Sequence, residues 1–135
     1  MDIQKKKILI IDDEEAVQKI LVSKLSGAGF EPLSAMDGKE GLEVTRKEKP
    51  DLILLDIVMP VMDGISYLKE IKKDSEVGSI PILILTNLAS DEMVQKSLEE
   101  GVTDYLVKAD YTLDKLVERI NEKLNALDGL KAIVI

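Results

Sequence analysis

The sequence predicts an α/β fold, a doubly wound parallel sheet of five strands with five helices. Apolar runs of about four to six residues alternate with amphipathic stretches of about ten to fourteen, as in successive βαβ units. The runs are continuous rather than alternating, which is typical of strands covered by helices on both faces. At 135 residues, the chain suits a single domain with one well-formed core.

The apolar runs and the turns between them predict strands at 7–11, 30–34, 52–55, 80–85 and 104–107. The second strand contains Pro32. Because proline cannot donate to a strand ladder, we expect this strand at an edge of the sheet.

Helical spacing and capping residues predict helices at 15–27, 38–48, 64–74, 91–100 and 113–127. Asp37, followed three residues later by Glu40, has the pattern of a capping box. Ser90 and Thr112 are the expected N-caps of the last two helices. Residues 128–135 form an apolar C-terminal tail: an extension that packs, a dimer contact, or a truncated linker. We therefore predict a domain at 1–127 and a tail at 128–135.

Composition excludes several classes of function. The chain has no cysteine and no histidine, so disulfides, thiolate or histidine zinc sites and Ser-His-Asp catalysis are excluded. A formal net charge of −8 argues against direct nucleic-acid binding. The apolar runs are too short for a membrane span or a signal peptide, so we expect a cytoplasmic protein without membrane partners.

Chemically distinctive residues follow four of the predicted strands. The first is followed by Asp12 and Asp13, the third by Asp56, the fourth by Thr86 and the fifth by Lys108. In open α/β sheets, ligands bind outside the carboxyl ends of the strands, so these side chains should converge. Two unit charges about 4 Å apart repel by roughly 4 kcal/mol at an effective dielectric of about 20. We therefore expect a cation among the acids, and Mg²⁺ is the natural candidate for an all-oxygen site.

With these residues in view, the chain resembles the receiver domain of two-component response regulators (the CheY-like family). The resemblance covers about 5–127. It rests on Asp12-Asp13, Asp56, Met59-Pro60, Asp63-Gly64, Thr86, Tyr105 and Lys108. It implies a flavodoxin-like sheet with strand order 2-1-3-4-5.

The resemblance also implies roles for these residues. Asp56 would accept a phosphoryl group as an aspartyl-phosphate. Asp13 and Asp56, with the backbone carbonyl of Val58, would bind Mg²⁺, and Asp12 would lie close by or act through water. From the residues alone, Asp12 and Asp13 could also cap the first helix and interact favourably with the positive end of its dipole. Glu14 and Glu15 are expected to be solvated.

Thr86 and Lys108 would contact the phosphoryl oxygens, because phosphoryl transfer is catalysed mainly by positioning and by electrostatic stabilisation. Thr86 and Tyr105 would form the switch, with the ring following the hydroxyl after phosphorylation. Taken alone, Thr86 is an ordinary strand end, Lys108 an exposed lysine and Tyr105 a half-buried ring that fills a gap.

The implied partners follow from the same resemblance. A sensor histidine kinase or a phosphotransfer protein would donate the phosphoryl group, since this chain has no histidine of its own. The fourth helix, fifth strand and fifth helix would form the responsive face, open to a downstream target, an output domain or a second copy. The protein would be a signalling domain that catalyses only its own phosphorylation and dephosphorylation.

Several positions depart from the family pattern. Ala109 follows Lys108 where most relatives have proline, often after a cis bond, and a cis bond before alanine costs about 2.5–4 kcal/mol. We therefore expect either strain or a rerouted backbone there. Asn87 is bulkier than the usual residue, and we expect it to narrow access to Asp56. Val58 and Leu88 are apolar, so neither can position an attacking water, and a long-lived phosphoryl group is expected.

Three alternatives remain. A Mg²⁺-dependent phosphatase of the haloacid dehalogenase type also uses an Asp nucleophile, but its second Asp would stand where this chain has Val58. A flavodoxin-like FMN carrier would need a phosphate loop where this chain has four acids, Asp12 to Glu15. The third is a degenerate receiver that acts only as a protein-interaction module, against which the acids and Lys108 argue.

Overall fold

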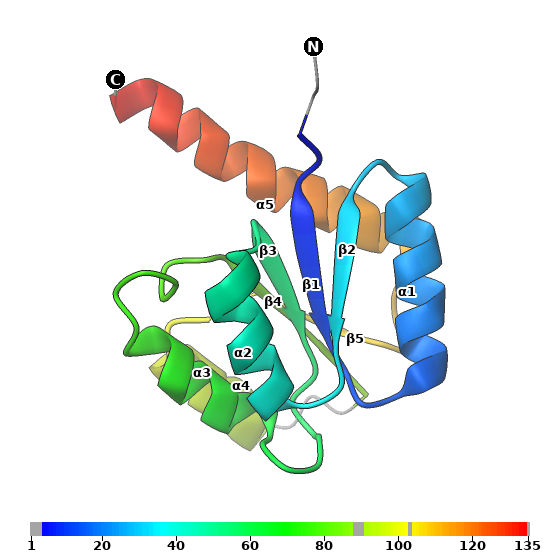
Figure 1. Ribbon diagram of the computed structural model, residues 1–135, viewed down its shortest axis with the longest axis vertical. Helices are drawn as coiled ribbons and strands as arrows, with labels where there is room; N and C mark the ends of the chain where they lie inside the picture. Colours follow the sequence, from blue (N-terminus) through cyan, green and yellow to red (C-terminus); the bar gives the residue numbers. More distant parts are fainter. Residues whose placement is uncertain (1–3, 88–90, 103, 135) are drawn as a thin grey trace.

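Five parallel strands and five helices form a three-layer sandwich (Figure 1). The computed structural model describes the backbone of residues 4–87, 91–102 and 104–134, and the side chains of these residues as far as 126 with the exception of Asp91. The strands are β1 (Lys7–Ile11), β2 (Glu31–Ala35), β3 (Leu52–Leu55), β4 (Ile82–Thr86) and β5 (Tyr105–Val107). The helices are α1 (Glu15–Gly27), α2 (Gly38–Glu48), α3 (Gly64–Lys72), α4 (Asp91–Glu99) and α5 (Leu113–Val134).

The strand order is β2-β1-β3-β4-β5, and every pairing is parallel. This confirms the predicted fold and the edge position of the strand that contains Pro32. Successive strand residues point to opposite faces of the sheet, and both faces are buried. Leu9, Ile11, Ile53 and Leu55 pack toward α2 and α3. On the other face, a second cluster includes Ile8, Ile10, Leu52 and Leu54 with residues of α1 and α5.

Small differences from the predicted bounds have local causes. β2 begins after Phe30 because the Phe30 amide donates to the carbonyl of Leu25 at the end of α1. β4 begins after Pro81, which has no amide proton to donate. α3 ends at Lys72, two residues early, where the Asp74 carboxylate accepts from the amide of Glu76 and starts a turn.

The helix caps agree with the sequence where they are described. Asp37 accepts from the amide of Glu40 at 2.9 Å, and Glu40 accepts in return from Met36 rather than from Asp37. Thr112 Oγ1 accepts from the amide of Lys115 at 3.2 Å. The expected cap Ser90 lies outside the described residues.

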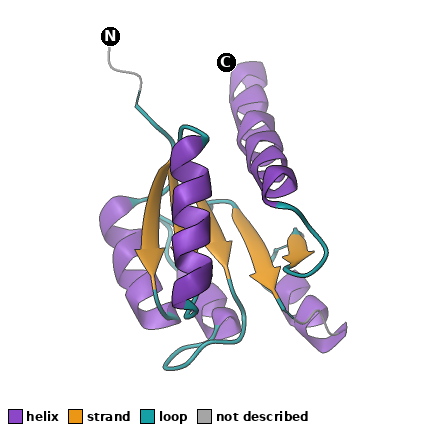
Figure 2. Cartoon of the chain, turned by 90° about the vertical axis from the view of Figure 1, so that its right-hand side faces the viewer, coloured by secondary structure: helices purple, strands orange, loops and turns teal. Residues whose placement is uncertain are grey.

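The last helix is longer than predicted. It continues seven residues beyond 127, to Val134, and extends past the end of the sheet in both views (Figures 1 and 2). The backbone of 128–134 therefore continues α5 instead of forming a separate tail. The division into a domain at 1–127 and a tail at 128–135 stays a prediction.

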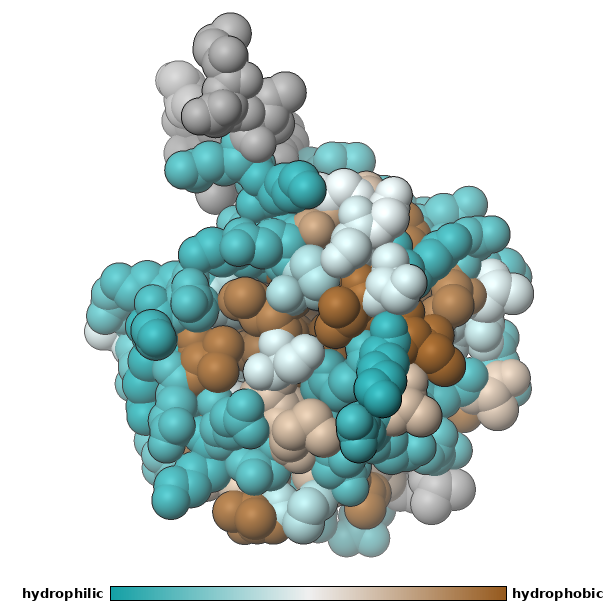
Figure 3. Space-filling view, turned by 45° about the vertical axis from the view of Figure 1, so that its right-hand side comes forward, coloured by the Kyte–Doolittle hydropathy of each residue, from teal (hydrophilic) through white to brown (hydrophobic). Residues whose placement is uncertain are grey.

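The surface seen in Figure 3 is mostly hydrophilic, with separate hydrophobic patches. No helix among the described residues is both long and apolar enough to cross a membrane.

Candidate phosphoacceptor and metal site

Backbone hydrogen bonds beyond the strand ends bring the acids together. Ile11 and Leu55 are paired across β1 and β3, and the Asp56 amide donates to the carbonyl of Ile11 at 2.9 Å. The Asp12 amide donates in the same way to the carbonyl of Ala35 at 3.1 Å. The ladder therefore continues one residue past each strand and fixes Asp12 and Asp56 side by side.

Three carboxylates form the centre of the site. Asp12, Asp13 and Asp56 each offer an oxygen, and these oxygens all lie within 4.8 Å of one another. The side chains of Asp12 and Asp56 are 3% and 6% exposed, whereas Asp13 is exposed. Hard oxygen donors gathered at one buried point fit Mg²⁺, which takes few protein ligands and retains several waters.

Lys108 reaches the acids from β5. Its Nζ lies 2.5 Å from Asp12 Oδ2 and 3.5 Å from Asp56 Oδ2, and its side chain is only 10% exposed. The Lys108–Ala109 bond is trans. The rerouting expected at Ala109 is a turn, in which the amide of Asp110 donates to the carbonyl of Val107. The missing proline therefore does not move Lys108 away from Asp56.

The electrostatics of the site depend on burial. Burial raises the pKa of the Asp56 carboxyl to about 6; Lys108 lowers this pKa and Asp12 raises it further. Burial alone would lower the pKa of the Lys108 ammonium. Its hydrogen bond to Asp12 and the nearby charges of Asp56, Asp12 and Glu14 outweigh burial, so this pKa lies above its usual value. The positive charge of Lys108 thus offsets only part of the effect that burial and the neighbouring Asp12 have on the Asp56 pKa.

The loop between β3 and α3 is held close to Asp56. The Gly64 amide donates to the carbonyl of Ile57 at 2.7 Å, and Asp63 caps α3 by accepting from the amide of Ser66. A Cβ atom on Gly64 would lie 2.5 Å from the carbonyl oxygen of Asp56, so only glycine fits. The local structure therefore explains the Asp63-Gly64 pair: Asp63 caps the start of α3, and Gly64 lets the backbone approach Asp56 closely.

The same loop contains a strained residue. Val61 has φ +67°, and its side chain is 80% exposed. A β-branched residue in the left-handed region is a true outlier. Val58, whose carbonyl is the expected third metal ligand, presents a side chain that is 63% exposed.

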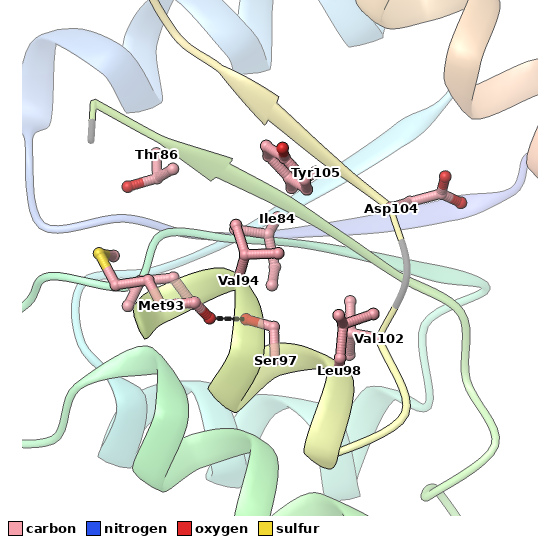
Figure 4. Close-up of a pocket in the computed structure, with 10 residues that line it drawn as sticks. Ile84, Thr86, Met93, Val94, Ser97, Leu98, Val102, Asp104 and Tyr105 are labelled. Atoms are coloured by element: carbon pink, nitrogen blue, oxygen red, sulfur yellow. Dashed lines mark hydrogen bonds between the residues drawn. The ribbon is translucent and has the colours of Figure 1, made fainter. Parts of the chain in front are cut away.

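The two expected switch residues line one small cavity (Figure 4). Thr86 is buried at the end of β4, whereas Tyr105, on β5, is 44% exposed. The opposite wall is formed by α4, including Met93, Val94 and Ser97. The cavity has a volume of about 30 Å³ and is lined by both the Tyr105 side chain and α4.

Sequence reasoning missed two residues at this site. Glu14 is exposed, as expected, but its contacts were not foreseen: its Oε1 lies 3.7 Å from Lys108 Nζ and accepts from Asn87 Nδ2 at 3.2 Å. Gln18, buried on α1, donates through Nε2 to the carbonyls of Ile10, Asp12 and Ala35 and so braces the turn that holds Asp12. A polar residue on an otherwise apolar helix face was the only signal for Gln18.

Comparisons with known proteins agree with this geometry. The family described as "Response regulator receiver domain" matches residues 8–121. The "Probable transcriptional regulator ycf27" of Cyanophora paradoxa is 43% identical over 129 residues, which are 96% of this chain and 52% of that protein. The chain thus spans about half the length of the curated relatives it matches.

Solved structures of receiver domains share the fold. The CheY-like response regulator receiver domain protein from Methanospirillum hungatei JF-1 has a TM-score of 0.86 at 31% identity, covering 93% of this chain and 98% of that one. The BeF₃-activated N-terminal receiver domain of Klebsiella pneumoniae RstA has a TM-score of 0.80 at 31% identity, covering 88% and 98%.

Proposed function

Because the chain belongs to the response regulator receiver domain family of two-component signalling, we propose that Asp56 is its phosphoacceptor. One observation carries this assignment. Asp56 is buried at a strand end, beside two further carboxylates and within 3.5 Å of a buried lysine. This arrangement is costly unless the site binds a cation and then an anionic group.

In the proposed reaction a carboxylate oxygen of Asp56 attacks the phosphorus of a phosphohistidine on a partner protein. The new bond joins this oxygen to phosphorus, the bond from phosphorus to the imidazole nitrogen breaks, and the imidazole takes up a proton. Asp56 must be ionised to attack. Its raised pKa of about 6 leaves most of it ionised at neutral pH, and the positive charge of Lys108 favours that form.

Asp12, Asp13, Asp56 and the Val58 carbonyl are the proposed Mg²⁺ ligands, and the three carboxylates within 4.8 Å support this set. When bound, Mg²⁺ would supply positive charge to the transferring oxygens. Lys108 supplies a second positive charge, and the buried Thr86 hydroxyl supplies a hydrogen bond. Because Val58 stands where a phosphatase of the haloacid dehalogenase type has its second Asp, turnover of a separate substrate is disfavoured.

Thr86 and Tyr105 are the proposed switch pair. The ring is half-exposed here and lines the same cavity as Thr86. Thr86 moving toward a phosphoryl group would open space next to this cavity, and the ring would follow. The change would alter the face formed by α4, β5 and α5, where Leu98 is 48% exposed. A downstream target, an output domain or a second copy of the chain would read this face.

A histidine kinase partner follows from the family. A phosphotransfer protein as donor, the absence of direct nucleic-acid binding and a cytoplasmic location stay predictions. The similar proteins named as transcriptional regulators support an output in gene regulation.

The intact mass of the protein after incubation with acetyl phosphate tests this proposal. We expect one added phosphate that requires Mg²⁺ and is absent in Asp56→Asn. Asp51→Asn is a matched control, because Asp51 accepts from the Lys7 amide and lies at the opposite end of β3. If wild-type protein with an intact fold gained no mass and bound no beryllofluoride, the chain would be a degenerate receiver.

A further inference from the structure

A polar bridge crosses the rim of the acidic site. Asn87, directly after β4, donates from Nδ2 to Glu14 Oε1 at 3.2 Å, and Glu14 directly precedes α1. The two residues are 73 positions apart in the chain, so the bond joins two separate loops. The same Glu14 oxygen lies 3.7 Å from Lys108 Nζ. Glu14 therefore connects the lysine of the site to the residue that follows Thr86.

We propose that Glu14 and Asn87 form a latch that holds Lys108 and the β4 end in their unphosphorylated positions. The inference rests on the proposed function and adds two positioning residues to it. Neither is a metal ligand or a phosphoryl contact. They act through Lys108 and through the backbone that Asn87 shares with Thr86.

The charges explain why the latch should open. Without a phosphoryl group, Lys108 is shared among Asp12, Asp56 and Glu14, at 2.5, 3.5 and 3.7 Å. A phosphoryl group on Asp56 adds strong acceptor oxygens on one side of this lysine. Lys108 then turns toward Asp56 and away from Glu14, the most distant and most exposed of its three acids.

The neighbouring backbone contributes the second half of the latch. Thr86 must move toward the same phosphoryl group, and Asn87 is its chain neighbour. The Lys108 amide also donates to the carbonyl of Thr86 at 2.8 Å, so the two strand ends move together. A shift of this pair pulls Asn87 from Glu14. The Glu14 contacts therefore favour the unphosphorylated arrangement and oppose activation.

Beryllofluoride binding at saturating Mg²⁺ tests the latch. We expect Asn87→Ala to bind beryllofluoride about three- to tenfold more tightly, since one exposed hydrogen bond to a charged group no longer has to break. Glu14→Ala should tighten binding by at least as much, because it removes both this bond and the charge beside Lys108. The double variant should gain no more than Glu14→Ala alone, because Glu14→Ala already removes the bond to Asn87.

Matched controls separate the latch from other effects. Glu15→Gln removes a charge one residue away, on a side chain that is 77% exposed and paired with Lys19, and should leave the affinity unchanged. Glu14→Gln keeps an acceptor for Asn87 but loses the charge beside Lys108, and should show an intermediate gain. Simple widening of the site entrance in Asn87→Ala would change the rates of binding and release together, leaving the equilibrium constant as it was.

The side-chain amide signal of Asn87 gives a direct readout in the unaltered protein. It should move to its solvent-exposed position on addition of beryllofluoride, and Glu14→Ala should place it there without ligand. Unchanged or weaker beryllofluoride binding in Asn87→Ala, or strictly additive gains in the double variant, would overturn the latch. A wild-type protein that binds no beryllofluoride at all would instead overturn the proposed function.

Discussion

β3 and β5 both end at the functional site, but they hold their residues in different ways. β3 lies between two strands and all four of its residues are buried. β5 is a three-residue edge strand, with one exposed and two half-buried residues, beside a cavity. The proposed phosphoacceptor Asp56 thus follows a strand fixed in the core, whereas Tyr105 lies on, and Lys108 directly after, a short and partly exposed edge strand. The proposed phosphoacceptor and the proposed switch ring are therefore held by strands that differ in local stability.

The largest expected effect comes from truncating one leucine on each strand. Leu54 is 1% exposed, and Leu106 is partly buried against the same apolar cluster. Leu54→Ala should lower the free energy of unfolding by about 3–4 kcal/mol, and Leu106→Ala by about 1 kcal/mol. Urea denaturation measures both. Equal losses would show that β5 is held as firmly as β3, and the comparison would fail.

The loop after β3 gives the next largest effect. Gly64→Ala places a methyl group 2.5 Å from the Asp56 carbonyl oxygen, so the loop must shift, at a cost of about 1–3 kcal/mol. Phosphorylation should also slow. Gly27→Ala is the control, because nothing lies within 4 Å of its Cβ position at the end of α1. A Gly64→Ala protein as stable as Gly27→Ala would mean that this loop is not fixed.

The buried carboxylate predicts a pH dependence in the metal-free protein. Asp56 has a folded pKa of about 6 against an ordinary value of 3.8. Because the folded pKa is raised, the contribution to stability is fully present below about pH 4 and is lost as pH rises through about 6. The loss should be about 1–2 kcal/mol, allowing for solvent screening.

Thermal denaturation in a chelating buffer between pH 4 and pH 7 measures this loss. Asp56→Asn should flatten the profile and make the metal-free protein more stable at pH 7. Added Mg²⁺ should restore stability to the unaltered protein at pH 7 but much less to the variant. A wild-type profile that does not change between pH 4 and pH 7 would contradict the electrostatic account of the site.

The smallest effect concerns the strained Val61. Its φ of +67° and 80% exposure mean that glycine removes backbone strain with little loss of packing. Val61→Gly should stabilise the protein by up to about 1 kcal/mol, less the added entropy of the unfolded chain. Val58→Gly, an exposed valine outside the left-handed region, should be neutral or destabilising. Calorimetry measures the stability of both variants, and a Val61→Gly protein no more stable than Val58→Gly would contradict backbone strain at Val61.

Most of the fold could be predicted because buried parallel strands appear in the sequence as continuous apolar runs. The α1 and α2 bounds, both capped or stopped by local signals, agree with the structure. The end of α5 was predicted at 127, within an apolar tail, but the helix continues to Val134. Asp12, Asp13, Asp56 and Lys108 converge as expected, since strand ends place them. Glu14 and Gln18 depended on side-chain directions that no periodicity in the sequence encodes.

The length of α5 has a mechanical consequence. At about 1.5 Å per residue, the ten residues after Leu124, the last residue of α5 that the core cluster includes among the described side chains, span about 15 Å. A tilt of about 5° where the helix crosses the sheet would therefore displace its far end by roughly 1 Å. The helix begins five residues after Lys108, so a small shift at the lysine that tilts the helix would grow toward the far end of the helix.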